Sequence, residues 1–133
     1  MNEVFLFVYG TLRDGAGGGM HRWLARRAQY VASATFPGRL YRLDGYPGAV
    51  PSDAPGALVH GEVYRLCDPD PVLAHLDRYE ECGPGAPEPT EFVRRMCDVR
   101  LHDGATVPAW IYLYNRRTDN LQPIPSGDFL ERS

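Results

Sequence analysis

The chain has 133 residues, of which 44% are hydrophobic and 23% charged, a composition typical of one globular domain. We therefore expect residues 1–133 to form a single domain. The formal net charge of -3 argues against a nucleic-acid-binding protein, because neutralising phosphates requires clustered cations. All 14 basic residues are arginine, so the chain supplies no lysine for a Schiff base or a P-loop.

The N-terminus and the cysteines bear on localisation and metal binding. Met1 to Glu3 carries no positive charge and the apolar run after it ends at Gly10, so we expect no signal peptide and no membrane span. Cys67, Cys82 and Cys97 form an odd count without a Cys-x-x-Cys motif, which argues against a disulfide framework or a zinc site. The four histidines are widely spaced. We expect a cytoplasmic protein without a metal or a cofactor.

The first part of the chain predicts strands and one short helix. Residues 3–9 are apolar and aromatic, which indicates a buried strand. A glycine-rich loop follows, and residues 20–28 predict a short helix. Residues 29–34 and 36–43 are typical of two strands, which we expect to be interrupted at Pro37-Gly38.

The middle of the chain predicts an irregular connection, a strand and a helix. Residues 46–56 contain several prolines and glycines, so we expect no regular structure there. Residues 60–66 predict a strand. Asp70-Pro71 then resembles the start of a helix, with an Asp cap followed by Pro in the first turn. We expect this helix to end near Glu80, before the Cys-Gly-Pro-Gly segment.

The last third predicts a β-hairpin and a surface tail. Residues 92–101 and 107–114 are strand-like and flank the turn residues 102–104, His-Asp-Gly. Residues 115–133 are polar and contain proline, so we expect them to lie on the surface. The order of elements is mostly β with a few short helices, which indicates the α+β class.

The turn Tyr9-Gly10-Thr11-Leu12 is the first candidate for chemistry. A strand that ends in a turn leaves backbone N–H groups without ladder partners, and these can converge on an anion or a carbonyl oxygen. Gly10 would permit close approach because it lacks a Cβ atom. The alternative is an ordinary connection, and the residues alone leave both interpretations open.

The end of the predicted helix carries the second candidate, the pair Glu80-Glu81. A carboxylate in the last turn of a helix faces the negative end of the helix dipole, and burial would raise its pKa further. Such a group can accept and donate a proton near neutral pH. Neighbours on a helix diverge by about 100°, so only one of the two can point inward. The alternative is a solvated acidic helix end.

These segments together resemble the γ-glutamylcyclotransferase-like family, in particular its bacterial γ-glutamylamine cyclotransferase-type members. The resemblance covers nearly the whole chain in the expected order. It rests on Phe7-Val8-Tyr9-Gly10-Thr11-Leu12, His21, Gly38-Arg39-Leu40-Tyr41, Gly45-Tyr46-Pro47-Gly48, Val59-His60-Gly61-Glu62-Val63-Tyr64, Leu76-Asp77-Arg78-Tyr79-Glu80, Phe92-Val93-Arg94, Ala109-Trp110-Ile111-Tyr112 and Ile124-Pro125-Ser126-Gly127-Asp128-Phe129.

The resemblance implies a small mixed-sheet β-barrel with flanking short helices and a cavity at one end. It implies that the turn Tyr9, Gly10, Thr11 and Leu12 lines the cavity and binds substrate, together with Tyr112. Glu80 matches the family's acid/base, whereas Glu81 falls where relatives often carry Gly or Ser. Gly45 to Gly48 could form part of the rim.

The chain departs from the family pattern in two places. Many relatives have Tyr where this chain has Phe92, and the segment before Phe92 is long and rich in proline. Both departures bear on the identity of the substrate more than on the chemistry. Arg94 either enters the cavity or forms an ion pair with Asp77 or Glu62.

The family reaction cyclises a small-molecule γ-glutamyl amide to 5-oxoproline and releases a free amine. Because nucleophile and electrophile belong to one molecule, the protein has to fold the substrate, move one proton and stabilise an oxyanion. No cofactor or metal is needed. The alternative function is a ligand-binding or interaction module with a vestigial, non-catalytic pocket.

Overall fold

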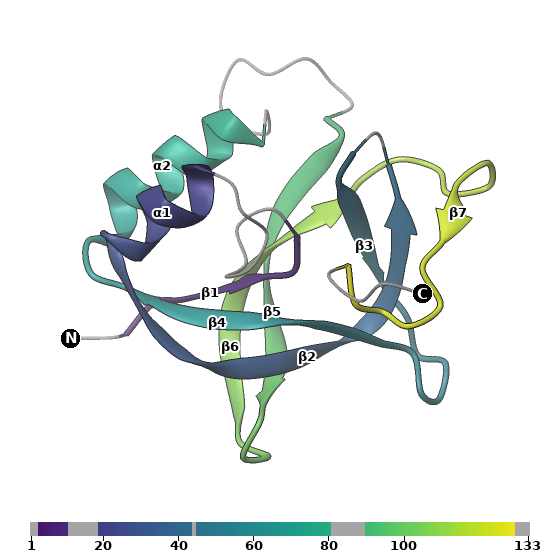
Figure 1. The fold of residues 1–133 in the computed structure, drawn as a ribbon, viewed down its shortest axis with the longest axis horizontal. Coiled ribbons are helices and arrows are strands. Elements are labelled where there is room, and N and C mark those ends of the chain that lie inside the picture. Colours follow the sequence, from purple (N-terminus) through teal and green to yellow (C-terminus); the bar gives the residue numbers. More distant parts are fainter. Residues whose placement is uncertain (1–2, 11–18, 44, 81–89, 130–133) are drawn as a thin grey trace.

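The computed structural model describes residues 3–10, 19–43, 45–80 and 90–129. Within these residues, seven strands and two helices follow one another along the chain (Figure 1). The elements are β1 (Phe5–Val8), α1 (Gly19–Ala25), β2 (Ala28–Arg42), β3 (Pro47–Pro51), β4 (Leu58–Leu66), α2 (Pro69–Tyr79), β5 (Phe92–Leu101), β6 (Thr106–Tyr114) and β7 (Gln122–Pro123).

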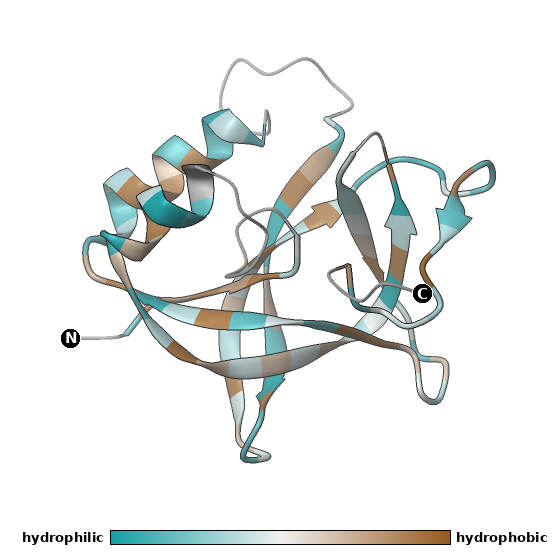
Figure 2. Ribbon diagram, in the orientation of Figure 1, coloured by the Kyte–Doolittle hydropathy of each residue, from teal (hydrophilic) through white to brown (hydrophobic). Residues whose placement is uncertain are grey.

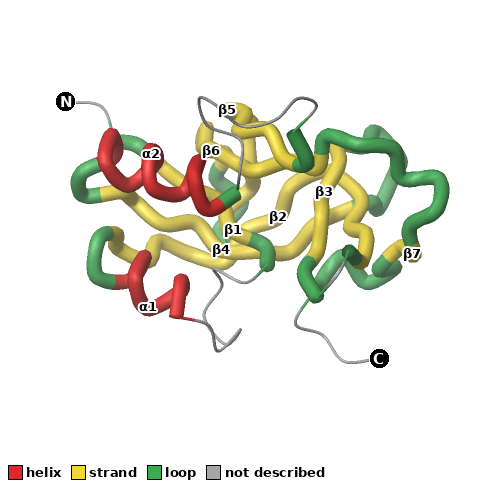
Figure 3. Tube along the Cα trace, turned by 90° about the horizontal axis from the view of Figure 1, so that it is seen from above, coloured by secondary structure: helices red, strands yellow, loops and turns green. Residues whose placement is uncertain are grey.

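Five of the strands close into a barrel in the order β2-β4-β1-β6-β5. The ring is completed by the pairing of β5 with β2, in which Ala34 lies opposite Leu101 and Thr35 opposite Arg100. The sheet is mixed, because β1 runs antiparallel to β4 and parallel to β6. Both helices lie at one end of the molecule, and β7 lies at the other (Figures 1 and 3). The prediction of an α+β fold with a small mixed-sheet barrel and flanking short helices is confirmed.

Strand β2 is continuous, so the predicted interruption at Pro37-Gly38 is wrong. Its first part pairs with β4 as far as Pro37 opposite Leu58, and its last part pairs with β3 from Gly38 opposite Pro51 onward. The proline therefore sits where one partner strand is exchanged for the other, a place where a missing N–H is tolerated. A Cβ atom on Gly38 would lie 2.5 Å from the carbonyl oxygen of Val50, so close pairing requires glycine there.

Two segments predicted to be irregular or peripheral contribute strands. Residues 47–51, within the expected irregular connection, form β3 at the edge of the sheet, with prolines at its first and last positions, which edge strands accept. The predicted surface tail contributes β7, which pairs with the end of β2. Ile124 and Phe129 of this tail pack against the buried interior. Proline content therefore misled the prediction, because edge positions do not need every backbone N–H.

The helix boundaries also differ from the prediction. The sequence contains two consecutive Asp-Pro pairs, and the prediction placed the start of the helix at the second, Asp70-Pro71. Helix α2 instead begins at the first pair, with Asp68 as its N-cap and Pro69 as its first residue. Pro71 is still accepted, because the first N–H groups of a helix have no intrahelical partner. Helix α1 ends at Ala25 instead of residue 28, since Ala28 already pairs with Leu66 in β4. The predicted end of α2 near Glu80, its C-cap, is correct.

The buried side chains form two clusters on the two faces of β1. Leu6 and Val8 face the helices and pack with Leu24, Val72 and Leu76, among others. Phe7 and Tyr9 point the other way, into the barrel. The alternation is visible as bands of brown and teal along the strands (Figure 2). Strand β1 therefore separates the two clusters, and its end at Tyr9 lies at the boundary between them.

Substitution of Gly127 by Ala should test whether the tail is part of the fold. Gly127 has a φ of 70°, its carbonyl accepts a hydrogen bond from the N–H of His60 at 2.8 Å, and an added Cβ would overlap the carbonyl oxygen of Leu58. We expect Gly127→Ala to lower the unfolding free energy by more than about 2 kcal/mol in urea titration. Gly104→Ala, with a φ of 94° but open space around the Cβ, is the control and should cost about 1 kcal/mol. Equal losses would contradict the packing argument.

Candidate active site

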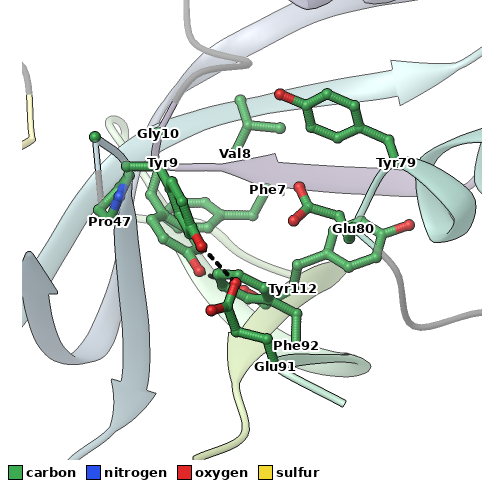
Figure 4. Close-up of a pocket in the computed structure, with 12 residues that line it drawn as sticks. Phe7, Val8, Tyr9, Gly10, Pro47, Tyr79, Glu80, Glu91, Phe92 and Tyr112 are labelled. Carbon is green, nitrogen blue, oxygen red and sulfur yellow. Dashed lines mark hydrogen bonds between the residues drawn. The ribbon is translucent and has the colours of Figure 1, made fainter. Parts of the chain in front are cut away.

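A cavity of about 330 Å³ lies where the ends of β1 and α2 approach each other. Its volume is in the range of small-molecule sites. Residues from both buried clusters line it, as do residues of the segment before β3 and of the start of β5 (Figure 4). The lining residues are Phe7, Val8, Tyr9, Gly10, Gly45, Tyr46, Pro47, Tyr79, Glu80, Glu91, Phe92 and Tyr112. Gly45, Tyr46 and Pro47 belong to the segment for which the sequence indicated a place at the rim.

Tyr9 is a buried wall of the cavity that ties three strands together. Its hydroxyl donates a hydrogen bond to the carbonyl oxygen of Tyr112 in β6. The same hydroxyl accepts one from the N–H of Ala49 in β3 at 3.2 Å. Burial raises the pKa of Tyr9 far above its ordinary value, with a smaller contribution from the negative charge of Glu80. The side chain therefore stays a neutral hydroxyl, suited to fixing the position of the cavity wall.

Gly10 brings the end of β1 close to β3. A Cβ atom on this residue would lie 2.9 Å from ring carbons of Pro47, which is closer than side chains normally pack. Gly10 lines the cavity, as the sequence indicated. The other two residues of the candidate turn, Thr11 and Leu12, lie outside the described residues, so their part in the site stays a prediction.

Glu80 lies at the end of α2 and directs its carboxylate into the cavity (Figure 4). Its backbone N–H closes the helix by donating to the carbonyl oxygen of Leu76 at 2.8 Å. The pKa of Glu80 is raised to about 7, mainly by burial and to a smaller extent by the negative charge of Glu91. The sequence suggested a raised pKa from burial and the helix end, but not from a second carboxylate. Glu81 lies outside the described residues.

Asp77, one turn before Glu80, fixes the end of α2 to the sheet. Arg94 in β5 donates to both of its oxygens, from Nε at 2.8 Å and from Nη2 at 3.1 Å. The Tyr112 hydroxyl in β6 donates to Oδ1 at 2.7 Å. The Arg94 guanidinium also lies 4.3 Å from the ring centre of Trp110. Of the alternatives for Arg94, the structure shows the ion pair with Asp77. Tyr112 donates a hydrogen bond to the same carboxylate and also lines the cavity.

Glu91 is a cavity residue that the sequence did not reveal. Its Oε1 accepts a hydrogen bond from the Tyr46 hydroxyl at 2.7 Å, and its Oε2 lies 3.8 Å from Nη1 of Arg116. It belongs to no motif and precedes a predicted strand by one position, after a proline-rich segment. The only available signal was its place next to Phe92, a position where the chain departs from the family pattern.

The described part of the chain contains no group of three or more His, Cys, Asp or Glu side chains that could hold a metal ion. Among the same residues, no helix is both long and apolar enough to cross a membrane. The arrangement is a cavity with two carboxylates, several aromatic rings and a glycine at its edge. Such a cavity can exchange a proton with a small polar ligand.

Replacing Glu80 by Gln should stabilise the protein at alkaline pH. Because the pKa is about 7 in the folded protein and near 4.5 otherwise, the folded state binds the proton more tightly, and stability is lost as the pH rises from about 4.5 to 7. The variant lacks this loss. We expect the variant to have a higher unfolding free energy than the unmodified protein at pH 8. The difference between the two proteins should shift in favour of the variant by up to about 3 kcal/mol from pH 4 to pH 8. A pH-independent difference would indicate an ordinary pKa.

Three comparisons identify relatives of this chain. The family model described as "Gamma-glutamyl cyclotransferase, AIG2-like" matches residues 6–131. The gamma-glutamylcyclotransferase family protein YtfP of Escherichia coli (strain K12) is 37% identical over 128 residues, which cover 96% of each chain. The gamma-L-glutamyl-butirosin B gamma-glutamyl cyclotransferase of Niallia circulans is 35% identical over 113 residues, which cover 84% of this chain and 67% of that protein.

A solved structure agrees with these sequence matches. The solution NMR structure of ytfP from Escherichia coli has a TM-score of 0.65 and 36% sequence identity, covering 96% of this chain and 97% of that one. The fold of this chain therefore agrees with that of this relative along most of its length. The prediction made from the motifs is thus confirmed, and the chain belongs to the gamma-glutamyl cyclotransferase, AIG2-like family.

Proposed function

We propose that the protein is an enzyme that cyclises a γ-glutamyl amide to 5-oxoproline and releases a free amine, with Glu80 as general acid and base. Membership of the family supports a reaction of this class. One relative, from Niallia circulans, is named gamma-L-glutamyl-butirosin B gamma-glutamyl cyclotransferase. The substrate of this chain and the role of Glu80 are proposals.

The reaction forms one C–N bond and breaks another within the same molecule. The α-amine nitrogen of the substrate attacks the γ-carbonyl carbon, and the amide bond to the leaving amine breaks. Two protons leave the α-ammonium nitrogen as it becomes the lactam N–H, and the leaving nitrogen gains two when the amine departs as an ammonium ion. A single group that accepts each proton in turn and passes it to the leaving amine completes the balance. Glu80 supplies this group in the proposed mechanism.

The observation that carries the proposal is the raised pKa of Glu80 in a cavity of suitable size. A carboxylate with a pKa of about 7 is partly ionised at neutral pH and binds a proton strongly enough to return it. An ordinary surface carboxylate would be a much weaker base. The family reaction needs a base of this kind and no metal. Glu80 alone can therefore supply the base that the reaction requires.

The other predicted site residues fit supporting roles. The amides of Gly10, Thr11 and Leu12 would hold the carboxylate or the developing oxyanion of the substrate, because free backbone N–H groups are well suited to this task. Tyr9 and Tyr112 are rigid walls, each held by hydrogen bonds to other elements. Rigid walls help to hold the substrate in the folded shape that brings its amine to its own carbonyl.

Release of 5-oxoproline from γ-glutamyl amides is the direct test. The purified protein is incubated with L-γ-glutamyl amino acids, γ-glutamyl polyamines and ε-(γ-glutamyl)-lysine, and 5-oxoproline is quantified. At least one amide should react, and acetylation of its α-amine should abolish the reaction by removing the nucleophile. Glu80→Gln preserves shape but loses the proton carrier, so kcat should fall by about 10²–10⁴-fold while binding is largely spared.

Two variants serve as controls for this experiment. Glu81→Gln changes the neighbouring carboxylate, which does not match the position of the family's acid/base, and should change turnover little. Glu3→Gln changes an exposed carboxylate paired with Arg65 outside the cavity and should have no effect. If every amide is inert while one binds, the protein is a non-catalytic binding module. If turnover survives Glu80→Gln, another group moves the proton.

The pH dependence gives a second test of Glu80. Because kcat/KM reports the free enzyme, it should fall about tenfold per pH unit below a midpoint near 7, where Glu80 becomes protonated. The midpoint should be the same for substrates with different leaving amines, since it belongs to the protein. The residual activity of Glu80→Gln should lack this limb. A midpoint near 4.5 would contradict the assignment of the base.

A further inference from the structure

The cavity carries two negative charges and, within its described lining, no positive one. Glu80 and Glu91 are its ionisable carboxylates, and no Arg or His is among the residues that line it. Their carboxylates enter the cavity from different sides (Figure 4). The proposed reaction uses one base, so it explains Glu80 but leaves Glu91 without a task. A second carboxylate raises the cost of burying the first, as its contribution to the Glu80 pKa shows.

Glu91 is held in a fixed position. Its carbonyl oxygen accepts a hydrogen bond from the N–H of Asn115 at 2.7 Å. The preceding Thr90 is buried, its hydroxyl donates to the carbonyl oxygen of Phe92 at 2.7 Å, and its own carbonyl oxygen accepts from Asn115 Nδ2 at 3.1 Å. The Tyr46 hydroxyl then orients the carboxylate through Oε1. A side chain fixed at both backbone and carboxylate is ready to bind without further ordering.

The charge of Glu91 is only partly compensated within the protein. Its Oε2 lies 3.8 Å from Nη1 of Arg116, which is longer than a hydrogen bond. The Arg116 side chain is half-exposed, so solvent screens this pair. One oxygen of Glu91 is therefore placed to receive a charged donor from a ligand in the cavity.

Aromatic rings beside Glu91 complete an environment suited to an alkylammonium group. The Tyr46 and Phe92 rings lie 6.2 Å apart between centres, and both line the cavity. Aromatic faces attract cations and also pack against methylene groups. A carboxylate together with such rings therefore favours a short alkyl chain that ends in an ammonium group. It disfavours a leaving group that carries a carboxylate.

We propose that Glu91 selects γ-glutamyl amides whose leaving amine carries a second, positively charged amino group, such as the amides of diamines. This inference rests on the proposed cyclotransferase function and names its substrate class. The γ-glutamyl part lies against Glu80 and Gly10, and the cationic end of the leaving amine lies against Glu91 and the Tyr46 ring. Amides of amino acids, which place a carboxylate there, are poor substrates.

One alternative role for Glu91 predicts a different result. Glu91 could bind the α-ammonium group that every γ-glutamyl amide carries. Its replacement would then lower activity on all amides by the same factor. A role toward the leaving amine lowers activity only on amides with a distal cation, so a ratio of rates separates the two roles.

Three amides of nearly equal size provide the test. γ-Glutamyl-1,4-diaminobutane carries a distal ammonium, γ-glutamyl-pentylamine replaces it with a methyl group, and γ-glutamyl-4-aminobutyrate carries a carboxylate. The unmodified protein should prefer them in that order of kcat/KM. Glu91→Gln keeps an oxygen that accepts the Tyr46 hydrogen bond but loses the charge. The lost charge also acts on the pKa of Glu80, but it does so equally for all three amides. The readout is therefore the ratio of kcat/KM for the diamine amide to that for the pentylamide, which should fall by about 10- to 100-fold.

Tyr46→Phe and Glu3→Gln complete the series. Tyr46→Phe frees the carboxylate of Glu91 without removing it, so it should reduce the preference for the diamine amide less than Glu91→Gln does. Glu3→Gln removes an exposed charge outside the cavity and should leave the preference unchanged. An unchanged ratio in Glu91→Gln, or an equal loss on all three amides, would overturn the inference while the cyclotransferase function stands.

A binding measurement keeps the inference testable if turnover is absent. Calorimetric titration of Glu80→Gln protein with the diamine amide and the pentylamide needs no reaction. The diamine amide should bind about tenfold or more tightly, and the added Glu91→Gln substitution should abolish that difference. If no amide is cyclised but this preference holds, the proposed function fails and the role of Glu91 stands. Equal binding of both amides would overturn the role of Glu91.

Discussion

The candidate site depends on the carboxylate of Asp77, which joins the last turn of α2 to the sheet. Three hydrogen bonds from two different strands converge on it, two from Arg94 and one from Tyr112. Its side chain is only 15% exposed, so removing a partner would leave a poorly solvated charge. Glu80 follows one turn later, and its place in the cavity is set by this attachment. The planar fork of Arg94, which a lysine could not reproduce, fixes direction as well as distance.

The cavity is lined by members of both buried clusters. Leu6 and Val8 pack toward the helices, whereas Phe7 and Tyr9 pack into the barrel. Val8 from the first cluster and Phe7 and Tyr9 from the second line the cavity at the end of β1. Burying Glu80 in this cavity costs stability, because its charged form is desolvated and repelled by Glu91. That cost is the expected counterpart of a useful base near neutral pH.

Local patterns determined how much could be predicted from the sequence. The β5–β6 hairpin follows from a turn ending in Gly104, whose φ of 94° suits glycine, and the end of α2 follows from the residues after Glu80. The continuity of β2 could not be predicted, since Pro37 is tolerated only because partner strands change there. Glu91 belongs to no motif and reaches the cavity through the tertiary pairing of β5. Thr11 and Leu12 stay predictions.

In the proposed mechanism, substrate discrimination and chemistry are divided between two carboxylates with different attachments. Glu80 is carried by a helix end, where burial and the charge of Glu91 give it the pKa of an effective base. Glu91 is carried by the start of a strand and oriented by Tyr46, from the segment before β3. Because these supports belong to separate elements, changes around Glu91 can alter the preferred leaving amine while the Asp77 attachment that positions Glu80 remains. A cavity built in this way accommodates different amines with one proton-transfer apparatus, since leaving-group recognition need not disturb the position of Glu80.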